Sequence, residues 1–79
     1  MSPDKLVHMA NSIGDYFAAY PDADEARAGI ATHLRRFWDP RMRRAMLAHV
    51  DRTGGTGLHP LVLQALQRHR TQLDPPAPG

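Results

Sequence analysis

The sequence contains no cysteine. This absence excludes disulfides, thiolate metal sites and cysteine-ligated iron–sulfur clusters in the chain. No apolar run approaches the ~18 residues that a transmembrane helix needs, and no basic segment followed by an apolar one opens the sequence. We therefore expect a cytoplasmic protein that does not associate with a membrane.

Sequence patterns that support catalysis are also missing. None of the five histidines forms a His-x-x-x-His pair or accompanies a glutamate at metalloprotease spacing. The glycine-rich run from Gly54 to Gly57 lacks the preceding strand and the Gly-Lys-Ser/Thr ending of a phosphate loop, which favours a plain interhelical linker. Asp22, Asp24 and Glu25 stand at a helix start, where capping accounts for them. We expect no catalytic, cofactor-binding or metal-binding residue, and no enzyme activity in the isolated chain.

The 79 residues are enough for one small domain. A chain of this length buries only about 60% of its unfolded surface and is marginally stable alone. Its content of 42% hydrophobic and 23% charged residues is typical of a globular protein. The end of the chain, Asp74-Pro75-Pro76-Ala77-Pro78-Gly79, cannot continue a helix. We predict a single helical domain over residues 1–73 and a disordered tail over residues 74–79.

Apolar residues recur at helical spacing throughout the domain. They predict an all-α fold, a small bundle of four short helices at about 3–19, 23–38, 40–50 and 60–72. Gly14 interrupts the first helix, which suggests that another backbone approaches it closely there. The apolar faces define a predicted core of Leu6, Met9, Ile13, Phe17, Ile30, Leu34, Phe37, Met42, Met46, Val50, Leu61, Val62 and Leu66. This core is thin for four helices, so a partner could complete it.

Residues 35–44, which we call the arginine corner, hold five of the ten Lys and Arg residues and the only Trp. Asp39 and Pro40 both end one helix and begin the next, because the residue before a proline avoids the α region and proline suits the first helical turn. A stop and a start without a spacer force a sharp turn, with Trp38 beside it at the edge of the predicted core.

Charge is unevenly distributed along the chain. Residues 1–34 carry a net charge of −3, whereas residues 35–52 carry +4 with six Arg and no Lys. The arginines could pair with the acids of the first two helices, or they could meet a partner. Arginine suits carboxylates and phosphates, and Arg and Trp are enriched in interface hot spots. The candidate partner-binding residues are Arg35, Arg36, Trp38, Arg41, Arg43, Arg44 and Leu47. Leu47, like Leu63, falls outside its helix's apolar stripe and is expected to be an exposed contact.

A nucleic-acid partner is the alternative at this corner. Two helices around a tight turn resemble a helix-turn-helix, but the turn is shorter than the usual 3–4 residues. The helix at 40–50 presents arginines and apolar residues rather than the Asn, Gln, Ser or Thr that read base edges. This disfavours sequence-specific binding. A small basic module that binds phosphate-bearing ligands, either nucleic acid or the guanine dinucleotide of a cofactor, remains an open alternative.

Three stretches of the chain carry a family resemblance through their order and spacing. They are Leu6-Val7-His8-Met9-Ala10-Asn11-Ser12-Ile13, Phe37-Trp38-Asp39-Pro40-Arg41-Met42 and Leu58-His59-Pro60-Leu61-Val62. With them the chain, up to about Arg68, resembles the delta subunit of bacterial NAD-dependent formate dehydrogenase. The proline-rich tail lies outside the resemblance.

This resemblance implies a non-catalytic accessory subunit of a cytoplasmic molybdenum or tungsten formate dehydrogenase. In such a complex the alpha subunit carries bis-molybdopterin guanine dinucleotide and iron–sulfur clusters, and the beta and gamma subunits pass electrons to FMN and NAD. The delta subunit is implied to support assembly, stability or cofactor insertion. The implied partners are the alpha subunit, with beta and gamma in the complex, and a chaperone for cofactor insertion.

Overall fold

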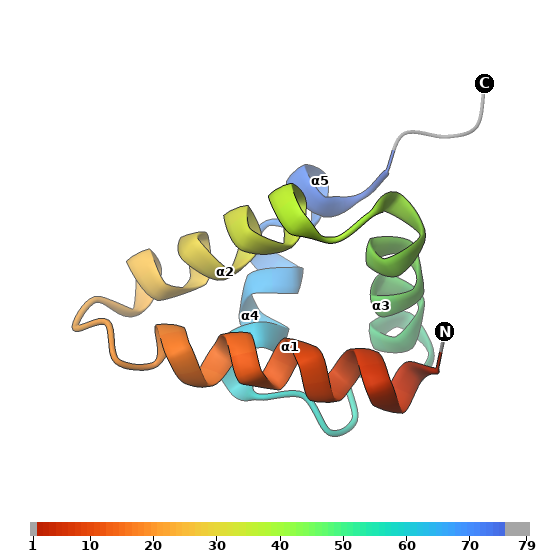
Figure 1. The fold of residues 1–79 in the computed structure, drawn as a ribbon, viewed down its shortest axis with the longest axis horizontal. Helices are drawn as coiled ribbons and strands as arrows, with labels where there is room; N and C mark the ends of the chain where they lie inside the picture. Colours follow the sequence, from red (N-terminus) through yellow and green to blue (C-terminus); the bar gives the residue numbers. More distant parts are fainter. Residues whose placement is uncertain (1, 76–79) are drawn as a thin grey trace.

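The computed structural model describes residues 2–75, in which helices are joined by short loops (Figure 1). No strand occurs within this range, so the predicted all-α fold is confirmed. The predicted tail falls mostly outside the described residues. The helices are α1 (Pro3–Phe17), α2 (Ala23–Phe37), α3 (Pro40–Thr53), α4 (Pro60–Arg68) and the short α5 (Arg70–Leu73).

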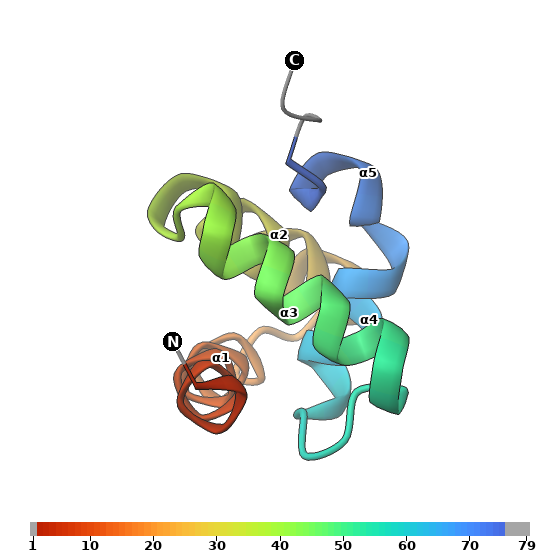
Figure 2. The same cartoon turned by 90° about the vertical axis from the view of Figure 1, so that its right-hand side faces the viewer.

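The first two helices form a V that the later helices fill. α1 and α2 run in opposite directions, meet at the loop that joins them and diverge toward the other end, where α3 lies (Figure 1). Turned by 90°, the molecule shows α1 almost end-on, with α3 crossing it steeply (Figure 2). α4 packs most extensively against α2 and also contacts α1, while α5 contacts α2 and α4. The core lies where these helices meet.

The helix starts follow their capping signals. The carboxylate of Asp22 accepts a hydrogen bond from the Asp24 amide at 2.8 Å, and that of Asp39 accepts one from the Met42 amide at 2.9 Å. Such bonds satisfy amides that have no partner inside the helix. Ser2 is the N-cap residue of α1, although its side chain makes no capping bond. The sequence alone did not reveal that the His59 side chain caps α4, accepting from the Leu61 amide at 3.1 Å.

Several helix ends differ from the prediction. α1 ends at Phe17 rather than at residue 19, and α3 continues to Thr53 instead of stopping at residue 50. The longer α3 ends where Gly54 adopts a φ of 77°, a left-handed conformation that glycine reaches at no steric cost. The predicted helix at 60–72 is broken at His69, which leaves the helical conformation and separates α4 from α5. The break places Leu73 in the core.

Eleven of the thirteen predicted core residues are buried or packed against the core, and two are on the surface. Met9 is 38% exposed and Phe37 is 67% exposed. The inward face of α1 instead uses Ala10 and Gly14, two small residues that bring its neighbours close. The core therefore rests partly on residues that the prediction left out. These are Ala10, Ala26, Ala31, Trp38, Leu47, Ala65 and Leu73.

Phe37 and Trp38 exchange the places that the sequence predicted for them. α2 ends at Phe37, and Trp38 has an extended backbone with φ −90° and ψ 133°. Helical spacing therefore no longer sets the direction of the Trp38 side chain, which turns inward until only 5% of it is exposed. The prediction of Phe37 in the core was wrong: its ring lies with that of His33, one turn earlier on α2, on a side of the helix that stays exposed.

Gly14 permits close contact between α1 and the start of α4. A Cβ at this position would lie 2.8 Å from Val62 Cγ2 and 3.0 Å from His59 Cγ. The sequence prediction of a close approach is confirmed, although side chains rather than a backbone make it.

Replacing Gly14 by alanine tests this contact. Helix propensity alone would favour the change by about 1 kcal/mol, whereas overpacking costs about 1–3 kcal/mol. We expect Gly14→Ala to lower the free energy of unfolding by about 1 kcal/mol, measured by urea denaturation. Ser12→Ala, on an exposed position of the same helix, should change it by less than about 0.5 kcal/mol. A Gly14→Ala variant that is more stable than the unchanged protein would contradict the close contact between α1 and the start of α4.

Candidate functional site: the arginine corner and an aromatic groove

The arginine corner has an exposed part and a buried part. The exposed arginines, which we call the free arginines, lie on the last turn of α2 and on the first turns of α3. Asp39 and Pro40 set the turn between these helices. The role of the arginines in partner binding stays a prediction. The free arginines are Arg35, Arg36, Arg41 and Arg44.

The buried part corrects the sequence interpretation of three residues. Trp38 is not at the edge of the core but within it, and Arg43 and Leu47 are only 6% and 3% exposed. The expectation that Leu47 is an exposed contact was wrong. Leu63, which had the same expectation, is half-buried and packs over Gly55. Trp38, Arg43 and Leu47 are therefore part of the packed interior of the isolated chain.

Arg43 holds α3 to the end of α5. Its guanidinium donates a hydrogen bond to the Leu73 carbonyl at 3.1 Å, and its Nε is buried without a partner. Leu47 follows one turn later on the same side of α3. This side was placed outside the apolar stripe because the sequence pattern does not reveal that Arg43 reaches the carbonyl of Leu73, thirty residues later in the chain. The long apolar stem of an arginine also packs well in such a position.

The ion pairs of residues 2–75 use other arginines. Asp24 pairs with Arg27 and with Arg68, and Asp51 pairs with Arg70. None of the pairs formed within this range includes a free arginine. The acidic residues of the first two helices therefore form no ion pairs with the free arginines. This argues against the interpretation in which the arginines of the corner pair with acids of the same chain. Four guanidinium groups remain available to an external acid.

The Asp51–Arg70 pair makes stability depend on pH. Arg70 donates to both carboxylate oxygens, at 2.7 and 2.8 Å, and these bonds, helped by the attraction of its charge, lower the pKa of Asp51. A carboxylate whose pKa is lower in the folded state than in the unfolded state stabilises the folded protein. This stabilisation is complete above the unfolded-state pKa of about 3.9, and it is lost as the pH falls through the folded-state pKa.

Asp51→Asn should therefore lower the urea midpoint of unfolding at pH 7. The difference from the unchanged protein should shrink as the pH falls below about 4 and disappear once the carboxyl is protonated in both states. Urea titrations across this pH range measure the difference. If the difference between the two urea midpoints did not change with pH, the Asp51–Arg70 ion pair would not contribute to the stability of the protein.

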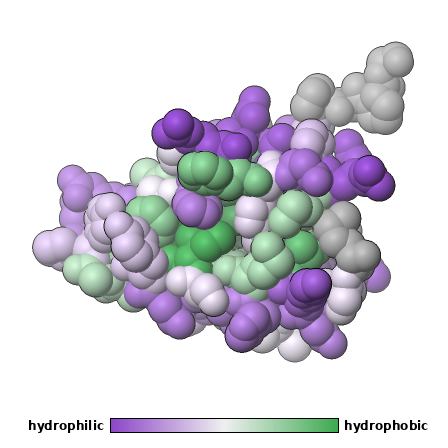
Figure 3. Space-filling view, viewed as in Figure 1, coloured by the Kyte–Doolittle hydropathy of each residue, from purple (hydrophilic) through white to green (hydrophobic). Residues whose placement is uncertain are grey.

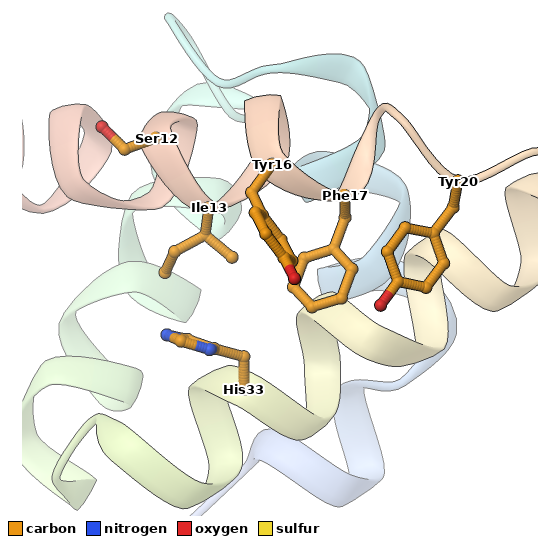
Figure 4. A pocket seen from close by; sticks show the side chains of 6 residues that line it. All are labelled: Ser12, Ile13, Tyr16, Phe17, Tyr20 and His33. Atoms are coloured by element: carbon orange, nitrogen blue, oxygen red, sulfur yellow. The ribbon is translucent and has the colours of Figure 1, made fainter.

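An aromatic groove lies between α1 and α2, close to the arginine corner (Figure 4). It encloses about 490 Å³ and continues over α2 into a second hollow of about 360 Å³, and Phe17 and His33 line both parts. The first part is lined by Ser12, Ile13, Tyr16, Phe17, Tyr20 and His33. The second part adds Ala28, Gly29, Thr32, Arg36 and Phe37.

Sequence reasoning did not identify this groove. Its one available signal was that all five aromatics occur in the first half of the chain. The groove depends on how α1 and α2 diverge, which their sequences do not specify. Viewed as in Figure 1, apolar surface extends over the space between the two helices, with hydrophilic residues on both sides (Figure 3).

Two of the five histidines, His49 and His59, take structural roles. His59 accepts from the Leu61 amide and lies 3.6 Å from the Asp15 carboxylate, and the His49 ring bonds to the Thr56 carbonyl at 2.8 Å. Residues 2–75 contain no group of three or more side chains suited to holding a metal ion. Within the same range, no helix is long and apolar enough to cross a membrane.

Comparison with known families gives one match. The family described as NADH-dependent formate dehydrogenase delta subunit FdsD matches residues 5–66, which span α1 to most of α4. The match includes the whole arginine corner and every residue of the aromatic groove. No curated protein and no solved structure gives a significant match to the chain.

Proposed function

Because the chain belongs to the delta-subunit family of NADH-dependent formate dehydrogenases, we propose that it is a non-catalytic accessory subunit of a cytoplasmic enzyme. In this proposal it docks on the catalytic alpha subunit, within a complex that also contains beta and gamma subunits. Docking supports assembly, stability or insertion of the molybdenum cofactor, with or without an insertion chaperone. The pterin, the metal, the iron–sulfur clusters, FMN and NAD belong to the other subunits.

The free arginines are the observation that best supports docking. They lie on one corner of the fold, exposed, and no ion pair within residues 2–75 uses them. Guanidinium groups bind carboxylates in paired hydrogen bonds, and a concentration of them favours an acidic surface on the partner. A 79-residue chain without cysteine is suited to binding rather than electron transfer.

Deletion of the gene in its native host tests the proposal. We expect less assembled formate dehydrogenase, less molybdenum or tungsten in the purified alpha subunit, or both, with NADH formation from formate reduced accordingly. The unchanged chain should restore these quantities. Arg41→Glu with Arg44→Glu should restore them poorly, whereas Arg52→Glu, at the exposed far end of α3, should restore them fully. Normal enzyme in the deletion strain would refute the proposal.

The same arginines support a second candidate, the binding of a phosphate-bearing ligand such as nucleic acid or the cofactor's guanine dinucleotide. Phosphate contacts release counterions, so the affinity should fall steeply with salt. Titration of the chain with labelled duplex DNA and with a guanine nucleotide at two salt concentrations measures this. Absence of binding at low salt removes the candidate.

A further inference from the structure

The aromatic groove is a preformed apolar surface. The Tyr16 and Phe17 rings meet edge to face at 5.0 Å between centroids, and Phe17 lies 5.1 Å from Tyr20. On the α2 side, His33 lies 4.7 Å from Phe37. Neighbouring rings therefore contact one another along both helices. Aromatic rings offer large contact areas with only two side-chain torsions, which is why interfaces favour them.

Three of the groove's aromatic side chains are exposed to solvent. Tyr16 and Phe37 are each 67% exposed, and Tyr20 is 40% exposed. Single exposed apolar residues are ordinary on protein surfaces, but a contiguous group beside a hollow marks a binding site. The hollows are large enough for one or two bulky side chains, and their open form suits a chain segment lying across them.

One end of the groove carries a cation. The Arg36 guanidinium lies 5.8 Å from the centre of the Phe37 ring, and Arg35 is its neighbour at the end of α2. Neither residue takes part in the ion pairs formed within residues 2–75. Asp15, although next to Tyr16, is directed to His59. At the opposite end of α2, Glu25 lies one turn before Gly29. The groove is therefore basic toward Phe37 and acidic toward the start of α2.

We propose that this groove binds a short segment of the alpha subunit that carries a bulky apolar side chain next to carboxylates. The apolar side chain enters between Tyr16, Phe17 and His33, and the carboxylates meet Arg36 at the Phe37 end. The inference rests on the proposed function and adds to it the recognition surface and the chemistry of the recognised segment. It also explains why Phe37 is outside the core, since its ring forms part of the docking surface.

Binding of the full chain to purified alpha subunit tests the inference. The dissociation constant is measured by biolayer interferometry for the unchanged chain, Phe37→Ser, Phe37→Leu, Arg36→Glu and the control Arg52→Glu. Phe37→Ser and Arg36→Glu should each weaken binding at least about tenfold, as expected for hot-spot residues. Phe37→Leu keeps an apolar side chain and should weaken it less than about threefold, and Arg52→Glu less still. Circular dichroism checks that each variant is folded, as expected for changes at exposed positions.

The outcomes separate the two proposals. If the unchanged chain binds and both groove variants bind equally well, the groove inference fails while the proposed function stands. If the unchanged chain does not bind at all, the proposed function fails. Self-association of the purified chain that Phe37→Ser abolishes would make a second copy the occupant and overturn the inference. A photo-crosslinking residue in place of Tyr16 should capture an alpha-subunit peptide with an apolar residue beside Asp or Glu, and a peptide without acids would contradict the proposal.

Discussion

Trp38→Ala is expected to lower the free energy of unfolding by about 3–5 kcal/mol, the cost of truncating a large buried aromatic. The side chain is 5% exposed and lies in the core at the turn between α2 and α3. A domain of this size has a total stability of about 4–12 kcal/mol, so the variant should be close to unfolding. Urea denaturation followed by far-UV circular dichroism measures the change.

The neighbouring residue provides the matched control. Phe37 is 67% exposed, so Phe37→Ala should change the free energy of unfolding by less than about 1 kcal/mol. The two adjacent aromatics thus differ in role, Trp38 in the fold and Phe37 on the surface. If Phe37→Ala lowered the free energy of unfolding more than Trp38→Ala did, Phe37 would be the core residue and Trp38 the residue at its edge, as the sequence predicted.

Leu47→Ala is expected to cost about 2–5 kcal/mol of unfolding free energy, because it leaves a cavity under α3. The residue is 3% exposed, although the hydrophobic pattern of α3 places it outside the apolar stripe. Ala48→Ser, at the adjacent exposed position, should cost about 0.5 kcal/mol or less through helix propensity alone. The same urea titration measures both variants.

The Leu47 variant also distinguishes a structural role from a docking role. If Leu47 lies in the core, its loss of stability appears in the isolated chain, without any partner. A variant with unchanged stability but weakened binding to the alpha subunit would instead put Leu47 on the surface. That result would contradict the packing of α3 against the rest of the fold.

The sequence predicted the helices well because their ends are chemically marked. Asp22 and Asp39 cap α2 and α3 as expected, and the prolines at the first positions of α1, α3 and α4 are in place. These are local signals, made by side chains within a few residues of the amides they satisfy. They indicate where a helix begins, but they do not determine which of its faces is covered.

Errors arose where contacts between distant segments decide burial. Trp38 follows the last residue of α2 and is buried, and the buried Arg43 bonds to the carbonyl of Leu73 at the end of α5. Periodicity assumes one continuous helix with one covered face. At Trp38 the helix had ended, and Arg43 is buried through a bond to a residue thirty positions away.

The sequence likewise predicted only one of the two parts of the candidate site. Charge composition identified the arginine corner, and four of its arginines are indeed exposed. The aromatic groove was missed because Phe17 and His33, which line both of its parts, are far apart in the chain and meet only through the packing of α1 on α2. Residues that share a groove across two helices leave no common spacing in the sequence.

The most direct test of the central claim is capture of the tagged chain from its native host, with the bound proteins identified by mass. The proposal predicts that the alpha subunit of formate dehydrogenase is recovered, and that Arg41→Glu combined with Arg44→Glu lowers its yield while Arg52→Glu does not. Recovery of a transcription complex without any formate dehydrogenase subunit would contradict the account.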